Sequence, residues 1–470
     1  MKKTLFTLTF VWIISVMPGL TGYLAGAQAV SQAQLNEIRG SFVKDAATKA
    51  IQNALVKDKD IKSFTYNHEK DGAIDHFFKY RCDVSGITNQ LSSGRCWMFT
   101  SMNVLRPTVM KKFNLKEFDF SHNYTFFWDQ FEKANLFLEN VIATTDRPIT
   151  DRDVEFYFKS PVADGGVWNL FYDAAEKYGV VPQVVMPETE HSNNTSQLRG
   201  VLNELLRTGG WNLREMAASG AKAKALEAKK IEILKDVYRV LALCLGEPPT
   251  EFTWRYRDAK GEVKTLKTTP MEFYKSIVPA DYNPDRFIMI MNDPTREYYK
   301  VYEIEYDRHV YDGQNWKFLN LPMDEIAKMA IASIKDSTML YMSCDVNKQY
   351  NRDRGYSDPM NYQYGPLLGT TFPMDKKERI MTFASSSTHA MTLMAVDLDE
   401  QQKPRKWMVE NSWGATSGYK GHIIMSDAWL GEYLFRLVVE KKYVPQRLLD
   451  LAKQKPIMLP AWDPLFAVEE

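Results

Sequence analysis

Hydrophobic residues recur along this chain with two different spacings. In residues 221–241 the apolar positions are three and four apart, with lysines and glutamates between them, which predicts an amphipathic helix with one packed and one solvated face. Continuous apolar runs predict buried strands at 287–291, 339–342, 391–396 and 433–439. Because these strand-rich segments follow a more helical first half, the pattern favours an α+β fold.

The first 29 residues differ from the rest of the chain. Two lysines precede an apolar run over residues 5–16, and Ala27-Gln28-Ala29 supplies the small residues that a signal peptidase reads. We therefore expect a secretory signal peptide at 1–29 and export of the mature chain, 30–470, to the periplasm or the medium, with no stable membrane anchor after cleavage. An uncleaved anchor is the alternative, because the whole segment is largely apolar.

Composition narrows the classes of function. The 470 residues are 45% hydrophobic and 25% charged, as in an ordinary globular protein, and 59 basic residues balance 59 acidic ones. The short basic clusters are typical of solvated loops, so a nucleic-acid partner has no support. The sequence contains no HExxH, CxxC or Walker-type glycine loop, so we expect neither a metal site nor a cofactor.

A candidate nucleophile stands at Cys96, six residues after Gln90. Cys96 opens an apolar, helix-like run, and a helix N-terminus supplies unpaired N–H groups and partial positive charge that stabilise a thiolate. The side-chain amide of Gln90 and the backbone N–H of Cys96 would then offer two donors to a developing oxyanion. For an isolated Cys-Trp pair, the alternative is a buried and inert cysteine.

The partners that a catalytic thiol needs lie far downstream. His389 precedes apolar residues that predict a buried strand, and Asn411 follows a second apolar stretch at 407–409. Two neighbouring strands would bring the two side chains together, so that His389 acts as the base and Asn411 orients it. Taken alone, a core histidine and a turn asparagine would explain them. Their occurrence after Cys96, in this order, favours the catalytic interpretation.

These residues resemble the papain superfamily, and in particular the family of bleomycin hydrolase and aminopeptidase C. Residues 88–97 read TNQLSSGRCW, in which Ser93 replaces the half-cystine that papain-like enzymes carry and Arg95 precedes the cysteine. Further similar strings include FFWD at 126–129, DGGVW at 164–168, NSWG at 411–414 and LPAWDP at 459–464. The resemblance covers almost the whole mature chain. It implies a two-lobed papain-like fold, in which a helical lobe with large insertions faces a barrel-like sheet lobe.

The resemblance also implies roles for side chains around the catalytic residues. Trp413 would cover the hydrogen bond between the histidine and the asparagine, and Trp97 would support the cysteine. The Gly165-Gly166 pair would let a substrate backbone approach and pair like a strand, which side chains would block.

Two longer segments follow from the same resemblance. Cys96 and His389 are 293 positions apart (389 minus 96), whereas a papain-like enzyme needs about 130–150, so an inserted helical region is expected at about 195–280. The family places the C-terminal arm, here 459–470, in the cleft, where the carboxylate of Glu470 would meet the ammonium of a substrate. A homo-hexamer is implied as well.

The sequence thus predicts an exported cysteine aminopeptidase that acts on peptides. A papain-like cysteine endopeptidase with an open cleft and a non-catalytic peptide-binding protein are the alternatives. Cys344 is expected in a buried strand, whereas the sequence leaves open whether Cys82 and Cys244 form a disulfide.

Overall fold

The computed structural model describes residues 29–57, 60–71, 75–82, 84, 86–279, 282 and 284–466. The expected signal peptide therefore lies outside the described residues, except for Ala29, and so does Glu470 at the end of the expected arm. Within the described ranges, no helix has the length and apolar character needed to cross a membrane.

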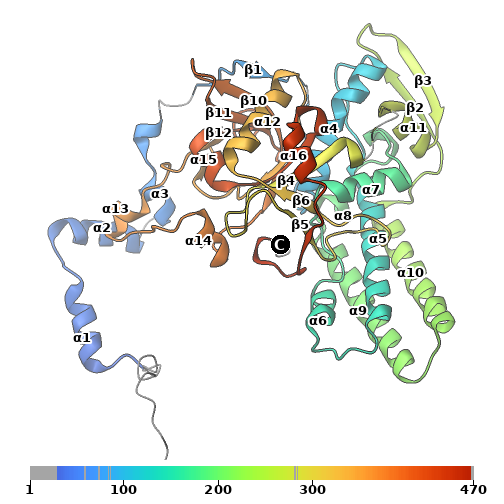
Figure 1. Ribbon diagram of the computed structural model, residues 1–470, viewed down its shortest axis with the longest axis horizontal. Coiled ribbons are helices and arrows are strands. Elements are labelled where there is room, and N and C mark those ends of the chain that lie inside the picture. Colours follow the sequence, from blue (N-terminus) through green and yellow to red (C-terminus); the bar gives the residue numbers. More distant parts are fainter. Residues whose placement is uncertain are drawn as a thin grey trace, which may run out of the picture. The chain divides into compact units, whose positions relative to one another are not determined.

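The chain divides into two compact units, residues 1–65 and 66–470. The described part of the smaller unit consists of the helices α1 (Gln32–Ser41), α2 (Ala46–Lys57) and α3 (Ile61–Thr65), drawn in blue in Figure 1. Neither α1 nor α2 has a buried side chain. All the expected site residues that the structure describes belong to the larger unit.

Helices dominate the first half of the larger unit (Figure 1). They are α4 (Cys96–Phe113), α5 (His122–Ala143), α6 (Arg152–Lys159), α7 (Trp168–Tyr178), α8 (Glu190–Asn193), α9 (Ser196–Ala218), α10 (Ala223–Leu245) and α11 (Pro270–Ile277). A hairpin of β2 (Phe252–Arg257) and β3 (Val263–Thr268) precedes α11. The segment at about 195–280 is therefore mostly helical but also contains two strands.

Helix α10 corresponds to the helix predicted over 221–241, and it packs against α5 and α9. Its buried apolar residues follow the helical repeat: Leu226, Ile233, Leu234, Val237, Leu241 and Leu245. The polar face differs from the prediction at Lys230, which is 6% exposed rather than solvated. The reason is a carboxylate on the neighbouring helix, because Lys230 forms an ion pair with Glu139 of α5.

Twelve strands of the described chain form one sheet, in the order β14-β5-β6-β4-β13-β7-β10-β11-β12-β9-β8, with β1 paired to β10. The strands are β1 (Tyr80–Arg81), β4 (Phe287–Met291), β5 (Val301–Ile304), β6 (Lys317–Asn320), β7 (Leu340–Cys344), β8 (Tyr350–Asn351), β9 (Tyr356–Ser357), β10 (His389–Leu398), β11 (Pro404–Glu410), β12 (His422–Ser426), β13 (Leu434–Glu440) and β14 (Ile457–Leu459). The four predicted strands are confirmed as β4, β7, β10 and β13.

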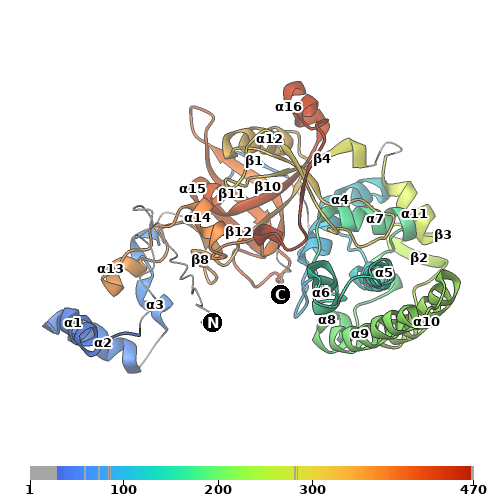
Figure 2. The same ribbon diagram turned by 60° about the horizontal axis from the view of Figure 1, so that its bottom comes forward.

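Five more helices accompany the sheet: α12 (Met323–Lys335), α13 (Tyr364–Leu368), α14 (Lys376–Met381), α15 (Asp427–Tyr433) and α16 (Gln446–Leu451). Figure 2 shows the helices α4 to α11 gathered on one side of the larger unit and the sheet on the other. One cluster of buried apolar residues runs through the helices and onto the sheet, and a second lies between the sheet and the helices α12 and α15. The predicted α+β class with two lobes is confirmed.

Strands β10 and β11 carry the expected base and its partner. They pair antiparallel, with Thr392 opposite Glu410 and Leu393 opposite Val409. The start of β10 and the end of β11 therefore lie at the same edge of the sheet. All ten residues of β10 are buried, and α4 packs against this strand. This contact joins the two lobes.

The structure describes all four cysteines and contains no disulfide. Cys344 lies fully buried in β7, as predicted. Cys82 belongs to the core beside α12 and α15, whereas Cys244 lies on α10 in the helical lobe. The pairing that the sequence left open is therefore not formed.

Candidate active site

Cys96 is the first residue of α4, so its thiol lies at the positive end of an 18-residue helix. The side chain is 3% exposed. Arg95 occupies the N-cap position, and its side chain makes no cap hydrogen bond. This position favours the thiolate form of a cysteine, as the helix-like run after Cys96 predicted.

Polar contacts hold the loop before Cys96 at the point where papain-like enzymes have a disulfide. Arg95 is fully buried, and its guanidinium pairs with Glu188 at 2.9 Å. Its Nε also donates to the hydroxyl of Ser93 at 3.0 Å. Sequence reasoning noted Ser93 and Arg95 as departures from papain but assigned them no role. The partner carboxylate lies 93 positions away, which no local pattern reveals.

Gln90 is tied to the segment that follows Asn411. Its backbone N–H donates to the carbonyl of Ser412 at 2.8 Å, and the hydroxyl of Ser412 donates to its Oε1 at 2.6 Å. The amide nitrogen of Gln90 consequently faces the Cys96 loop, where it donates to the carbonyl of Ser93 at 2.6 Å. A carboxamide nitrogen carries two protons, so the second proton can serve an oxyanion beside Cys96.

His389 and Asn411 are in contact, as the two apolar stretches predicted. Nε2 of His389 lies 2.8 Å from Oδ1 of Asn411, which also accepts from the backbone N–H of Ser412 at 2.8 Å. The indole of Trp413 stacks on the imidazole, with ring centroids 4.7 Å apart and an interplanar angle of 29°. The imidazole ring is therefore held at one edge and covered on one face.

Burial determines the protonation of this histidine. His389 is 4% exposed, and burial lowers its pKa to about 4, although the hydrogen bond to Asn411 opposes the shift. At pH 7 the imidazole is neutral. With its proton on Nε2, facing the oxygen of Asn411, Nδ1 keeps a lone pair that can accept a proton.

Backbone contacts bring the loop that leads to Cys96 beside this histidine–asparagine pair. Asn89 pairs with Trp413 in an antiparallel bridge, and the N–H of Gly414 donates to the carbonyl of Thr88 at 3.0 Å. Together with the contacts of Gln90, these interactions form a short ladder between residues 88–90 and 412–414. The structure thus gathers segments that are more than 300 positions apart, as the distance of 322 positions between Gln90 and Ser412 illustrates.

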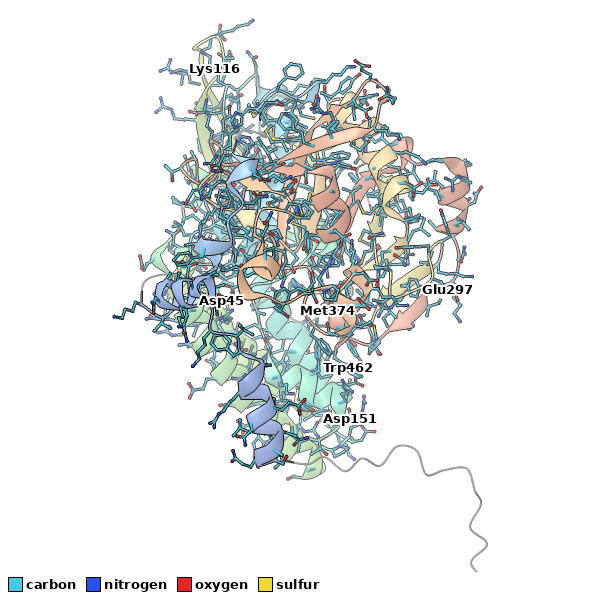
Figure 3. All side chains as sticks on the ribbon, turned by 90° about the vertical axis from the view of Figure 1, so that its left-hand side faces the viewer. Asp45, Lys116, Asp151, Glu297, Met374 and Trp462 are labelled. Carbon is cyan, nitrogen blue, oxygen red and sulfur yellow. The ribbon has the colours of Figure 1, made fainter. Side chains whose placement is uncertain are left out.

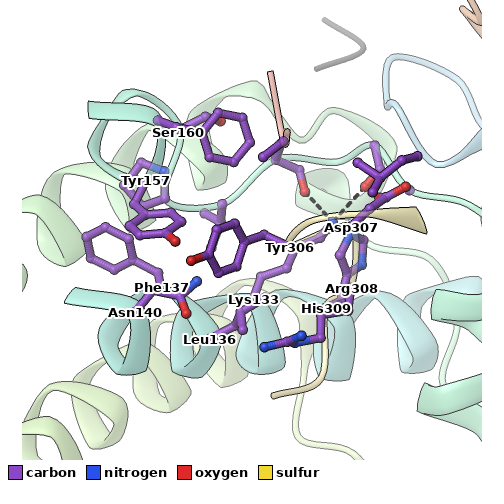
Figure 4. Close-up of a pocket in the computed structure, with 18 of the residues that line it drawn as sticks. Lys133, Leu136, Phe137, Asn140, Tyr157, Ser160, Tyr306, Asp307, Arg308 and His309 are labelled. Carbon is purple, nitrogen blue, oxygen red and sulfur yellow. Dashed lines mark hydrogen bonds between the residues drawn. The ribbon is translucent and has the colours of Figure 1, made fainter. Parts of the chain in front are cut away.

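The Gly165-Gly166 pair lines a cavity of about 190 Å³ between α5, residues 304–309 and Ala461 of the arm (Figure 4). The sequence led us to expect that these positions are glycine because a side chain would block the substrate. For Gly166 the structure gives another reason, since an added Cβ would lie 2.6 Å from the indole of Trp97. Trp97 is fully buried and closes the wall behind the glycine.

The C-terminal arm is anchored at several points before its end. Strand β14 (Ile457–Leu459) pairs in parallel with β5. Trp462, labelled in Figure 3, lies 4.5 Å from the guanidinium of Arg152 at the start of α6. Asp463 forms an ion pair with Arg296. The expected contact of Glu470 with a substrate lies outside the described residues and stays a prediction.

A comparison with known protein families matches residues 29–466 to the Peptidase C1-like family. Aminopeptidase C of Lactobacillus delbrueckii subsp. lactis is 40% identical over 401 residues, which are 84% of this chain and 89% of that protein. Human bleomycin hydrolase is 40% identical over 405 residues, with the same two coverages. A solved structure, PepW of Lactobacillus rhamnosis HN001, has a TM-score of 0.89 at 38% identity and covers 93% of this chain and 99% of its own.

Proposed function

The chain belongs to the Peptidase C1-like family and is a cysteine-type aminopeptidase, and we propose that it releases N-terminal residues from peptides by attack of the Cys96 thiolate. The observation that carries this assignment is the buried hydrogen bond between His389 and Asn411, covered by Trp413. It holds the imidazole in the tautomer and orientation that a base needs.

In the acylation step, the Cys96 sulfur attacks the carbonyl carbon of the first peptide bond. The carbonyl oxygen becomes an oxyanion, which accepts hydrogen bonds from the Gln90 amide and the Cys96 backbone N–H. His389 takes the thiol proton on Nδ1 and gives it to the amine that leaves as the C–N bond breaks. Asn411 stabilises the imidazolium that forms in between, because its Oδ1 accepts the Nε2 proton.

Deacylation uses the same groups in the reverse order. A water molecule gives a proton to His389 and attacks the thioester carbonyl, so that the oxyanion forms again between Gln90 and Cys96. Collapse of this intermediate breaks the C–S bond, and the proton returns from His389 to the sulfur. The free N-terminal amino acid leaves.

The anchored arm supports removal of single N-terminal residues. Ala461 lines the cavity beside the glycine pair, and Asp463 is fixed by Arg296, so the chain end continues from a point next to the cleft. A carboxylate at Glu470 would meet the ammonium of a substrate and leave no room for residues before it.

The decisive experiment compares the free and N-acetylated forms of one peptide. The aminopeptidase should cleave the free form and leave the acetylated form intact, whereas equal rates would identify an endopeptidase. Cys96→Ala should abolish hydrolysis without lowering the melting temperature. Cys244→Ala, which removes a half-buried thiol on α10, is the matched control and should keep full activity. Activity in the Cys96→Ala variant would overturn the assignment.

Export and assembly extend this proposal. The apolar N-terminal pattern and the Ala27-Gln28-Ala29 string support a secreted enzyme whose mature chain begins near Val30. The resemblance supports a homo-hexamer. Mass spectrometry of the protein from its native host and light scattering of the purified chain test the two points separately, and an intact Met1 or a monomer would refute them.

A further inference from the structure

A buried ionic cluster lies on α5, behind the Gly165-Gly166 segment. Lys133 donates to the carboxylate of Asp129 at 2.8 Å, and the other oxygen of Asp129 lies 2.6 Å from Nδ1 of His309. Lys133 is 6% exposed and Asp129 is 2% exposed. Burying an ion pair costs desolvation energy that apolar side chains of similar size avoid. The cluster is therefore poorly explained by stability alone.

The charges in the cluster balance without the histidine. Burial raises the pKa of Asp129, but the charge of Lys133 and the contact with His309 outweigh it, so the net shift is downward and the carboxyl is ionised. Burial and repulsion from Lys133 lower the pKa of His309 to about 4, although Asp129 opposes the shift. The imidazole is neutral at pH 7, and its Nδ1–H donates to Asp129. One carboxylate thus pairs with one ammonium.

The other two protons of Lys133 go to backbone carbonyls in and just before the glycine pair. Its Nζ donates to the carbonyl of Ala163 at 2.5 Å and to that of Gly165 at 2.9 Å, as the dashed lines in Figure 4 show. The carbonyl between them, of Asp164, accepts from the indole N–H of Trp97 at 2.8 Å. Three successive carbonyls are therefore taken by the protein. Among the described residues, no donor reaches the next carbonyl, that of Gly166.

The same wall supports the nucleophile. An added Cβ on Gly166 would lie 2.6 Å from the indole of Trp97 and 2.9 Å from the imidazole of His309. Trp97 directly follows Cys96 at the start of α4, and its ring meets that of His309 edge-on, with centroids 5.6 Å apart. The buried indole of Trp97 therefore contacts Gly166 on one side and is joined through the backbone to Cys96 on the other. The ionic cluster on α5 holds the glycine segment against this indole.

We propose that Lys133 is a positioning residue, which holds the carbonyls of Ala163 and Gly165 so that Gly166 presents its N–H and C=O to a peptide in the cleft. The inference rests on the proposed function, because it assigns a role in placing the peptide beside Cys96. Lys133 takes part in no bond that forms or breaks. An ammonium suits the task because three protons reach three acceptors, two carbonyls and one carboxylate.

The test removes both charges at once, because Lys133→Met alone would leave Asp129 without its cation. In the double variant Asp129→Asn/Lys133→Met, KM for a peptide with a free N-terminus should rise about tenfold, as expected for the weakening of one or two backbone hydrogen bonds. The value of kcat should stay within about twofold, because the catalytic groups keep their contacts. Alkylation of Cys96 by iodoacetamide needs no backbone pairing, so its rate should not change.

A matched pair of charges joins α5 to the neighbouring helix α10. Lys230 of α10 is also 6% exposed, and it pairs with Glu139 of α5; neither residue lines the cavity beside the glycine pair. The variant Glu139→Gln/Lys230→Met should leave KM unchanged. Lys133→Arg, which keeps the ion pair, provides a second measurement if the first double variant does not fold. Its planar fork cannot reach all three acceptors, so KM should rise here too.

An unchanged KM in the folded Lys133 variants would refute the positioning role. A parallel fall of kcat and of the alkylation rate would refute it as well, because it would reveal a general loss of structure. Neither outcome affects the proposed function, which depends on hydrolysis by the wild-type enzyme and on its loss in Cys96→Ala. A failure of the wild-type enzyme to cleave free peptides would instead overturn the function itself.

Discussion

The contact between Asn411 and His389 allows a quantitative prediction. Asn411 is 1% exposed, and its Oδ1 accepts from two buried donors, the imidazole Nε2 and the backbone N–H of Ser412. In Asn411→Ala both donors lose this acceptor. The imidazole also becomes free to turn about its side-chain bonds, because only the stacked indole of Trp413 still holds it.

The expected cost follows from the burial of these groups. A buried donor left without an acceptor costs about 1–3 kcal/mol. The imidazolium suffers this loss more than the neutral ring does, since a charged donor makes the stronger hydrogen bond. If this loss raises the free energy of the transition state by about 1–3 kcal/mol relative to the enzyme–substrate complex, kcat drops about fivefold to 150-fold. The loss is smaller than that of His389→Ala, which removes the base itself.

The assay measures kcat with a free peptide and corrects it for the folded fraction from a melting curve. Asn361→Ala is the matched control, because Asn361 is fully buried and donates to the carbonyls of Gln349 at 2.7 Å and Tyr356 at 3.0 Å, outside the site. It should lower the melting temperature and leave kcat per folded molecule unchanged.

Two results would refute this reasoning. A kcat within twofold of wild type in Asn411→Ala would show that the hydrogen bond does not orient the base. An undiminished rate in His389→Ala would remove the base assignment, and Asn411 would lose its role with it.

Three further predictions concern the tail, acid stability and the glycine wall. Deletion of residues 466–470 should lower the preference for free over N-acetylated peptides about tenfold to a hundredfold, because one charge-paired contact is worth about 1.5–3 kcal/mol. Unchanged discrimination would show that another group binds the substrate ammonium. His309 and His389 have folded pKa values of about 4, below the ordinary 6.5, so the unfolded chain binds more protons than the folded chain between these pH values. The free energy of unfolding should therefore fall as the pH drops from about 6.5 to 4, by up to about 3 kcal/mol per histidine. A melting temperature that is constant over this window would contradict the burial of both rings. Gly166→Ala should destabilise the fold by about 1–3 kcal/mol, because its Cβ would lie 2.6 Å from the indole behind it, and an unchanged melting temperature would show that the wall can yield.

The sequence alone predicted what depends on local pattern or on motifs. Apolar runs identified the strands β4, β7, β10 and β13, because a buried strand needs no information from outside its own residues. The repeat of three and four identified α10 in the same way. Motif order predicted Cys96, His389 and Asn411 as the catalytic residues, because a thiol peptidase needs these chemical types, and the structure brings His389 and Asn411 into contact.

Only the tertiary structure decided which side chains meet across the lobes. His309 and Asp129 are 180 positions apart, and Glu188 is 93 positions from Arg95, so neither pairing leaves a local signal. The string FFWD at 126–129 marked the family without indicating that its aspartate pairs with Lys133. The helix over 221–241 was predicted to have one solvated face, yet Lys230 on that helix is buried and pairs with a carboxylate of α5. Periodicity reports how a segment packs, whereas the partner of a buried charge depends on the path of the whole chain.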